Sequence, residues 1–284
     1  MYKRQVFPEG GICLIHGDTL STLLGLEMAR TAGLDVAHIE AGLSSLSLLE
    51  PFPEEIIRRW CSRRADILFS PNAQATINLK AMNVRGRIFE VGGNTIVDTL
   101  RLSERVACQT KIPEQPYAVV TCHRAETITR PERLKKVVSL IRQGSRHILM
   151  LFVVHNPTFH YLQRFGLMDR LAVPNIRVLS MQGYFDFINL VKNSRFVMTD
   201  GGSIQEECAY LNKPCLVLRC KTERHDGLGR NAVLWMFNEE IGRKFLANYE
   251  DLVQQQPPVW PSPSEKIVDV LVENGYGKPS HESG

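Results

Sequence analysis

Three acidic side chains, Asp18, Glu40 and Glu54, stand in polar segments that follow apolar runs early in the chain. Ligands of open α/β sheets bind beyond the carboxyl ends of the strands, so we expect these acids to meet at one sheet edge. Crowded carboxylates disfavour one another's ionisation, which equips one of them to donate or abstract a proton. The alternative is structural: Asp18 would cap the helix that begins near Leu20, and Glu54 or Glu55 would lie in the first turn of the next helix.

Two later segments have residue types that suit an anion. His123 and Arg124 follow a strand and precede a helix, so an imidazole and a guanidinium stand at the sheet edge; a surface pair is the alternative. Gly201 and Gly202 precede a helix that begins near Ser203, and glycines let the helix amides approach a ligand closely. This pattern predicts a diphosphate cradle, with a tight turn as the alternative.

Other polar residues also follow apolar runs. The segment Lys221 to Arg224 could supply a further cation to a phosphate, or it could be a solvated loop. His155 and Gln182 also follow strands and are candidates for ligand contact. Cys122 and Cys208 have no base at helical spacing, so we expect them to pack in the core.

The elements that position these residues follow from the hydrophobic pattern. Short apolar runs alternate with amphipathic stretches, which is typical of β/α units around parallel sheets. The predicted strands cover residues 11–16, 35–39, 66–70 and 87–91, then 117–122, 148–154, 175–179, 195–199 and 214–218. The predicted helices include residues 20–32, 53–64, 72–82, 94–106, one after Pro131, and a final one capped by Ser264 that runs to about Val272.

This alternation of predicted strands and helices indicates an α/β protein with two Rossmann-like lobes and a parallel sheet in each. We expect residues 1–109 to form a first lobe that carries the acids, and residues 110–258 a second lobe. Residues 259–284 would add a Pro-rich lead-in, a C-terminal helix and a tail.

Composition narrows the class of protein. The chain has 284 residues with a net charge of +4, and 44% of them are hydrophobic, which excludes a disordered or collagen-like protein. The small basic excess is spread along the chain, so we expect no nucleic-acid partner. The longest strongly apolar run, residues 148–154, is far shorter than a membrane span, so we expect no membrane partner.

Cofactor chemistry is not indicated either. The seven cysteines include no C-x-x-C pair, which disfavours a disulfide framework or a zinc site and fits a cytoplasmic protein. None of the eight histidines forms a ligand-spaced pair, so we expect no metal. The turn at Gly201 and Gly202 is not G-x-G-x-x-G, so we expect no NAD and no other cofactor.

Six motifs in order, HGDT, HIEAGLSS, PFPEE, HRAE, TDGGSIQEE and KPCLVLRCKTER, resemble the UDP-N-acetylglucosamine 2-epimerase family of the non-hydrolysing type. The resemblance covers about Gly11 to at least Arg224. It implies a fold of the GT-B type and a cytoplasmic homodimer that binds a UDP-sugar between its lobes. The implied reaction interconverts UDP-GlcNAc and UDP-ManNAc for cell-surface polysaccharide biosynthesis. A proton leaves carbon 2 and UDP is expelled, giving a bound 2-acetamidoglucal to which UDP re-adds.

The resemblance also implies a role for each matching residue. Asp18, Glu40 and Glu54 would be the catalytic carboxylates, and His123 the catalytic histidine near the diphosphate. The substrate-binding residues would be Arg124, Gln182, Phe187, Gly201, Gly202, Ser203, Glu207 and Arg224. Of these, Gln182 and Phe187 would frame the uracil, and Glu207 would hold the ribose hydroxyls.

This chain departs from the family pattern in several places. The family reads Asp-Ser-Gly-Gly where this chain reads Asp200 to Ser203, and Arg-Pro-Glu where it reads Arg224 to Asp226. The family's Gly-Thr-Arg-Pro-Glu loop and the β/α units around it are absent, so the first lobe is incomplete. We therefore expect the chain as given to be poorly soluble or inactive.

Three alternatives to a non-hydrolysing epimerase stay open. A GT-B glycosyltransferase would use the same UDP-sugar site to transfer the sugar to an acceptor, and it would not need all three carboxylates. A hydrolysing epimerase would differ only in whether water reaches the glycal. An inactive UDP-sugar-binding fragment is the third alternative.

Overall fold

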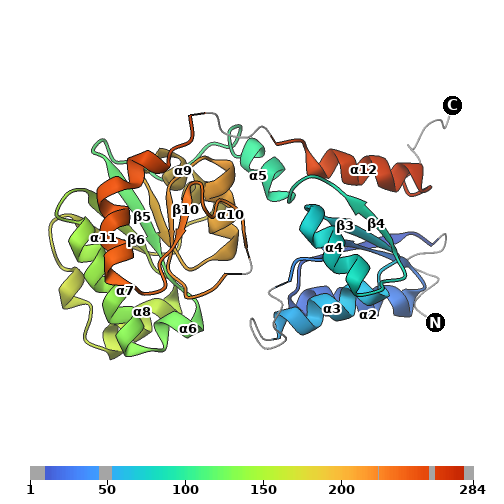
Figure 1. The fold of residues 1–284 in the computed structure, drawn as a ribbon, viewed down its shortest axis with the longest axis horizontal. Coiled ribbons are helices and arrows are strands. Elements are labelled where there is room, and N and C mark those ends of the chain that lie inside the picture. The colour runs from blue at the N-terminus through green and yellow to red at the C-terminus, as the bar shows by residue number, and fades with distance from the viewer. Residues whose placement is uncertain (1–9, 45–52, 223, 256–259, 278–284) are drawn as a thin grey trace. The chain divides into compact units, whose positions relative to one another are not determined.

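The computed structural model describes residues 10–44, 53–222, 224–255 and 260–277. The chain divides into two compact units: Met1–Asp98 with Trp260–Gly284 form unit 1, and Thr99–Val259 form unit 2. Each unit contains one parallel sheet with helices on both faces, so the predicted α/β class with two parallel sheets is confirmed (Figure 1). The motif residues Ser45, Pro51, Phe52 and Glu223 lie outside the described residues.

Unit 1 is a four-stranded sheet in the order β1-β2-β3-β4 with all neighbours parallel. Its elements are β1 (Ile12–His16), α2 (Leu20–Ala32), β2 (Asp35–Ile39), α3 (Glu54–Arg64), β3 (Ile67–Ser70), α4 (Ala73–Ala81), β4 (Arg87–Glu90) and α12 (Pro263–Glu273). One face is covered by α2, α3 and α4, through Leu26, Cys61 and Leu79 among others. The other face is covered by α12.

Unit 2 is a six-stranded sheet in the order β10-β9-β8-β5-β6-β7, again parallel throughout. Its strands are β5 (Tyr117–Thr121), β6 (Leu149–Val153), β7 (Ile176–Leu179), β8 (Val197–Thr199), β9 (Cys215–Val217) and β10 (Ala232–Leu234). Its helices are α6 (Ala125–Ile128), α7 (Pro131–Gly144), α8 (Asn156–Arg164), η1 (Asp169–Leu171), α9 (Tyr184–Asn193), α10 (Gly202–Tyr210), α11 (Glu239–Asn248) and η2 (Tyr249–Leu252). The boundary between the units falls inside α5 (Ile96–Leu102).

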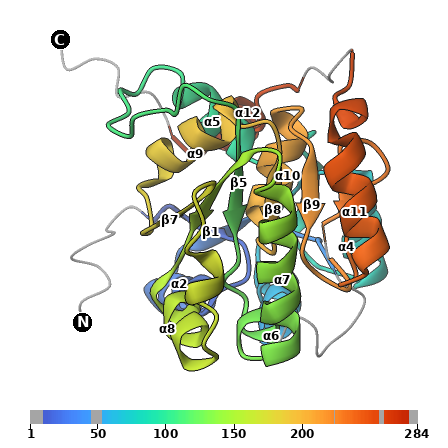
Figure 2. The ribbon, with the colours of Figure 1, turned by 90° about the vertical axis from the view of Figure 1, so that its left-hand side faces the viewer.

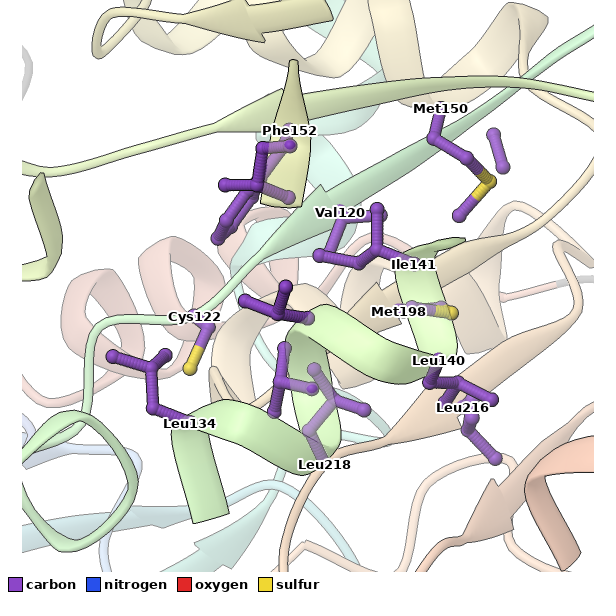
Figure 3. Close-up of a cluster of buried hydrophobic side chains, with 14 of the residues drawn as sticks. Val120, Cys122, Leu134, Leu140, Ile141, Met150, Phe152, Met198, Leu216 and Leu218 are labelled. Carbon is purple, nitrogen blue, oxygen red and sulfur yellow. The ribbon is translucent and has the colours of Figure 1, made fainter. Parts of the chain in front are cut away.

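The core of unit 2 has one apolar layer on each face of its sheet. Helix α7 begins with Pro131 and buries Leu134, Val137, Val138 and Ile141, as its pattern predicts, against side chains of β5 and β6 (Figures 2 and 3). The other face is covered by α9 and α10, which bury side chains such as Leu190 and Cys208. The strands are apolar on both sides because both faces of a parallel sheet are covered.

The structure differs from the sequence-based prediction at several points. Helix α5 ends at Leu102, four residues before the predicted end, and β10 and α11 were not predicted. The final helix begins after Ser262, whose hydroxyl accepts from the Glu265 amide at 3.2 Å, so the prediction that Ser264 is the cap is wrong.

Helix α12 belongs to unit 1 although it is far from it in sequence. Ile267, Val270 and Leu271 lie in the same buried cluster as Ile67 and Phe69 of β3. An apolar helix stripe must be buried against another element, and this sheet face supplies that element. The units therefore begin and end at other residues than the predicted domains 1–109, 110–258 and 259–284.

Candidate active site

The loop after β1 presents Asp18 to an arginine of α3. The Asp18 carboxylate forms an ion pair with Arg58, whose side chain is only 5% exposed. The N-cap of α2 is Thr19, whose backbone amide donates to the Thr22 hydroxyl at 3.2 Å. The structural alternative, in which Asp18 caps α2, is therefore wrong, and its carboxylate pairs with a buried cation.

Glu40 follows β2 in a backbone conformation that is uncommon for a residue with a side chain. Its φ is +67° and the residue is buried. The next amide, of Ala41, donates to the Phe69 carbonyl at 2.9 Å, which fixes the chain there. The Glu40 carboxylate lies 3.5 Å from the imidazole of His16. A side chain held this way in a left-handed conformation is typical of a functional position.

Glu54 is the first residue of α3. The structural alternative, that Glu54 or Glu55 lies in the first turn of this helix, is therefore confirmed. Its Oε2 atom is buried and has no hydrogen bond to any of the described residues. Glu55, in contrast, is completely buried and accepts from Arg58 at 3.0 Å and from Arg59 at 2.9 Å. The two neighbouring carboxylates thus differ: Glu55 is a structural ion-pair partner, whereas one oxygen of Glu54 is available.

A buried histidine supports the loop that carries Asp18. His38 Nε2 lies 2.8 Å from the Gly17 carbonyl, and its Nδ1 lies 3.2 Å from the Ser62 hydroxyl. Burial lowers the pKa of His38 to about 4, against a weaker opposing effect of the Gly17 hydrogen bond. His38 is therefore neutral near pH 7 and acts as a fixed hydrogen-bond partner between β2, α3 and the Asp18 loop.

In unit 2, Asp200 organises the loop that carries His123. Its buried carboxylate accepts the backbone amide hydrogens of His123 at 3.0 Å and of Arg124 at 2.9 Å. The thiol of Cys122 also donates to it, at 3.2 Å. Because β5 and β8 are neighbours, Asp200 reaches the next strand's loop directly.

The His123 ring lies at the surface of this loop. Its side chain is 35% exposed and stacks on His155, with the ring centroids 4.8 Å apart. Burial lowers the pKa of His123, while Asp200, whose Oδ1 lies 3.4 Å from Nδ1, raises it. A Cβ added at Gly201 would lie 3.2 Å from His123 Cε1, so this glycine provides room for the ring.

The turn at Gly201 leads directly into α10. The Gly201 amide donates to the Thr199 hydroxyl at 2.9 Å, and α10 begins at Gly202. Gly201 has a φ of −81°, so the turn does not require glycine for its backbone conformation. Ser203 is exposed in the first turn of the helix, where amides have no intrahelical acceptor. This geometry suits an anion.

The segment after β9 is hydrogen-bonded to α10. Gln205 is buried, and its amide donates to the carbonyls of Arg224 and Asp226, each at 3.0 Å. The Arg224 side chain is 13% exposed and pairs with Glu206 at 2.7 Å. Arg224 thus stands beside α10, held by an acid that the sequence analysis did not single out.

Glu207 and Tyr184 connect α10 to α9. The Tyr184 hydroxyl donates to the Glu207 carboxylate, and burial raises the pKa of Glu207 to about 7 although that hydrogen bond lowers it. Phe187 is half-buried on α9 and packs against the apolar layer. Gln182 precedes α9 and accepts from the Thr110 hydroxyl at 3.1 Å.

Two groups of the predicted residues thus gather, one in each unit. Asp18, Glu40 and Glu54 lie in or beside the loops that follow β1 and β2. In unit 2, His123 and Gly201 to Ser203 lie at the start of α10, whereas Glu207 is in the middle of that helix and Gln182 and Phe187 belong to the start of α9. Sequence reasoning missed Arg58, Asp200 and Tyr184 as partners of these residues. Arg58 stands three residues after Glu55, with which it pairs, and this helical spacing of opposite charges is the signal that could have found it.

Among the described residues, no group of three or more His, Cys, Asp or Glu could hold a metal ion. Within the same ranges, no helix is long and apolar enough to cross a membrane.

Sequence comparison finds relatives along most of the chain. A family model described as UDP-N-acetylglucosamine 2-epimerase matches residues 9–269. A UDP-N-acetylglucosamine 2-epimerase of Methanocaldococcus jannaschii is 31% identical, with 94% of this chain and 76% of the relative covered. A homolog from Methanococcus maripaludis is 32% identical over 75% of this chain and 60% of its own length. The chain thus spans 60% to 76% of the length of these two relatives.

Solved structures of such enzymes are also similar. The crystal structure of the Methanocaldococcus jannaschii UDP-GlcNAc 2-epimerase in complex with UDP-GlcNAc and UDP gives a TM-score of 0.77 at 30% identity, covering 95% of this chain and 78% of that one. The Neisseria meningitidis enzyme bound to UDP-GlcNAc gives 0.79 at 27% identity, with 93% and 76% covered. A trehalose-6-phosphate synthase, at 11% identity and a TM-score of 0.51, shares the fold alone. The predicted GT-B class of fold is confirmed.

Proposed function

The chain belongs to the UDP-N-acetylglucosamine 2-epimerase family, and from this premise we propose that it interconverts UDP-GlcNAc and UDP-ManNAc. The observation that carries the proposal is the pair of carboxylates after adjacent parallel strands. Asp18 follows β1 and Glu40 follows β2, where His16 and Ile39 are paired in register. An acid at each of two adjacent strand ends suits chemistry that moves a proton at one carbon.

We assign the proton transfers to Asp18, Glu40 and Glu54. One carboxylate takes the proton from carbon 2 of the sugar while the bond from carbon 1 to the UDP oxygen breaks, which leaves UDP and 2-acetamidoglucal. UDP then re-adds at carbon 1, and a proton returns to carbon 2 on the opposite face. Inversion requires acid/base groups on both faces of the ring, which explains the need for more than one carboxylate.

The departing UDP carries negative charge that must be stabilised. We assign this task to His123, to Arg124 and Arg224, and to the backbone amides from Gly201 to Ser203. The support is that Asp200 fixes the His123 loop through backbone hydrogen bonds and that α10 begins at this turn. Donors held in place before the reaction stabilise a leaving anion without reorganising.

The nucleoside would be recognised by α9 and α10. We assign the ribose hydroxyls to Glu207, whose carboxylate retains acceptor capacity beside the Tyr184 hydroxyl. Gln182 and Phe187 would frame the uracil, with the half-buried Phe187 ring offering an apolar face.

The proposal extends to the setting of the enzyme. We propose a cytoplasmic homodimer that needs no metal or NAD and supplies a sugar for cell-surface polysaccharide biosynthesis. The free state of all seven cysteines, none of them in a disulfide, fits a reducing compartment. The family's chemistry needs only acids, bases and hydrogen-bond donors.

The test is proton NMR of UDP-GlcNAc in deuterated buffer, incubated with a protein that carries the family's N-terminal β/α units in front of this chain, and separately with the chain as given. The expected results are those of the completed protein, since we expect the chain as given to be inactive. We expect UDP-ManNAc to appear and deuterium to enter carbon 2 of both sugars. The Glu40→Gln variant should lose exchange by at least about a hundredfold, in the range of general acid/base contributions. Glu273→Gln changes an exposed carboxylate on α12 and is the matched control. Release of free sugar in place of UDP-ManNAc, or UDP binding without any exchange, would refute the proposed reaction.

A further inference from the structure

A pocket lined by arginines lies at the other end of the unit 1 sheet from the proposed catalytic loops. Its volume is about 630 Å³, and its lining consists of Glu27, Arg30, Arg63, Arg64, Ala65, Asp66, Arg85, Gly86 and Arg87. We call it the arginine pocket. It is formed by the ends of α2 and α3 and by the residues that precede or begin β3 and β4, whereas Asp18 and Glu40 follow the ends of β1 and β2.

The pocket has a marked excess of positive charge. Five arginines line it against one glutamate and one aspartate, which leaves three positive charges in excess. Arginine stays protonated at any physiological pH, so this excess is permanent. A permanent excess of this size in one concave site favours an anionic ligand.

The two acids of the pocket are already engaged. Asp66 accepts the Val36 amide at 2.8 Å and pairs with Arg30 at 3.1 Å. Glu27 pairs with Arg64 at 3.1 Å. Within the described ranges, Arg63 and Arg85 form no ion pair, and both are exposed. Their guanidinium groups are therefore available to a ligand.

Backbone packing fixes the arrangement of these arginines. A Cβ at Gly86 would lie 2.4 Å from the Ala65 carbonyl, so glycine is needed to bring the two segments together. The Arg87 amide donates to the Asp66 carbonyl at 2.9 Å. Arg85 and Arg87 are thereby held beside the end of α3, where Arg63 and Arg64 stand.

Helix dipoles explain only part of the cluster. Arg30 lies in the last turn of α2, and Arg63 and Arg64 lie in the last turn of α3, where cations are favourable. Arg85 precedes β4 by two residues and Arg87 begins it, and no such effect operates there. Their addition to the three helix-end arginines raises the excess from one positive charge to three.

We propose that the arginine pocket binds a small anion that carries two or more phosphate groups. Guanidinium groups bind phosphate through two parallel hydrogen bonds, and several converging arginines match several phosphates. The volume is within the range of small-molecule sites. Glu27 and Asp66, which stand within the lining, disfavour a continuous nucleic-acid backbone across it.

The test is isothermal titration calorimetry of inorganic tripolyphosphate into the full chain. The double variant Arg63→Ser/Arg85→Ser should bind at least about tenfold more weakly, because two charge-assisted contacts are lost. Arg142→Ser/Arg146→Ser makes the same charge change on exposed residues of unit 2 and should leave the affinity within about twofold. Both double variants leave the turn at Gly201 intact, so anion binding there does not separate them. Circular dichroism of both checks that folding is unchanged.

Three outcomes would overturn the proposal. Unchanged affinity in the pocket variant would show that tripolyphosphate binds elsewhere. Equal weakening in both double variants would show a response to net charge alone. Tight binding of a single-stranded oligonucleotide that is lost in the pocket variant, without binding of tripolyphosphate, would identify a nucleic-acid surface instead.

Discussion

The buried carboxylate of Asp200 lies 3.0 Å from the backbone nitrogen of His123 and accepts its hydrogen. The side chain of Asp200, in the loop after β8, therefore fixes the main chain of the loop after the neighbouring strand β5. The His123 ring depends on this contact for its position, because Asp200 Oδ1 also lies 3.4 Å from His123 Nδ1. The acid acts on the histidine through backbone and side chain together.

The first prediction concerns Asp200→Asn. An amide keeps one acceptor oxygen but replaces the other with a donor, which would face amide hydrogens or the thiol of Cys122. We expect the free energy of unfolding to fall by about 1–3 kcal/mol, the cost of an unsatisfied buried group. Epimerase kcat should fall more than KM changes, because the histidine is displaced without removal. Thr199→Ser, on the same strand, is the control, and equal losses of kcat in both variants would contradict the prediction.

The second prediction compares two arginines that share one acid. Glu55 is fully buried and pairs with Arg58, 5% exposed, and with Arg59, 27% exposed. Arg58→Met should lower the free energy of unfolding by about 3–5 kcal/mol, because buried partners lose their cation. Arg59→Met should cost less than about 1 kcal/mol, since this arginine is partly solvated. Urea denaturation of both variants measures the difference, and equal costs would contradict it.

Much of the fold could be predicted from sequence because parallel strands buried on both faces read as uninterrupted apolar runs. The runs at 117–122 and 148–154 became β5 and β6 almost without change. β10 (Ala232–Leu234) was missed although it begins an apolar run that extends to Phe237, and β8 and β9, which were predicted, are equally short. The place of α12 was not predictable, because only the three-dimensional structure reveals which exposed sheet face its stripe covers.

The candidate site was predictable in its residues but not in its connections. Asp18 and Glu40 follow apolar runs, so their sheet edge could be inferred. Local sequence offered a cap for α2 in Asp18, yet the side chain pairs with Arg58, forty positions away in the sequence. Sequence patterns carry local preferences, whereas this pairing depends on how α3 packs beside the β1 loop.

The third prediction is a pH dependence caused by His38. Its pKa is about 4 in the folded chain and 6.5 in its ordinary state. The unfolded chain takes up a proton below about pH 6.5 while the folded chain does not, so stability is lost as the pH falls towards 4. From pH 7 to pH 5 the loss should be roughly 2 kcal/mol. His38→Gln keeps hydrogen-bonding groups without this titration, so its urea denaturation should depend less on pH. An identical pH dependence in both proteins would contradict the prediction.

The fourth prediction has the opposite sign and belongs to Glu207. Its pKa is raised to about 7 by burial, from an ordinary 4.5. Below pH 4.5 this carboxyl is protonated in both states and costs no stability. Between pH 4.5 and 7 the unfolded chain releases the proton while the folded chain keeps it, so the free energy of unfolding falls as the pH rises through 7. Glu207→Gln removes the cost of a buried charge, so at pH 8 it should be roughly 2 kcal/mol more stable relative to the native chain than at pH 5.

Removal of the Tyr184 hydroxyl tests how much its hydrogen bond lowers the pKa of Glu207. The Tyr184 hydroxyl lowers the pKa of Glu207 by donating to the ionised form, so Tyr184→Phe should raise that pKa further and move the pH window upward.

If Glu207 accepts from the ribose hydroxyls, Glu207→Gln should also weaken UDP binding by about tenfold, because a charge-assisted contact becomes a neutral one. Calorimetric titration with UDP above pH 8 tests this where the native carboxylate is ionised. Unchanged UDP affinity together with the stability gain would leave Glu207 a buried structural acid and remove it from the proposed nucleoside site.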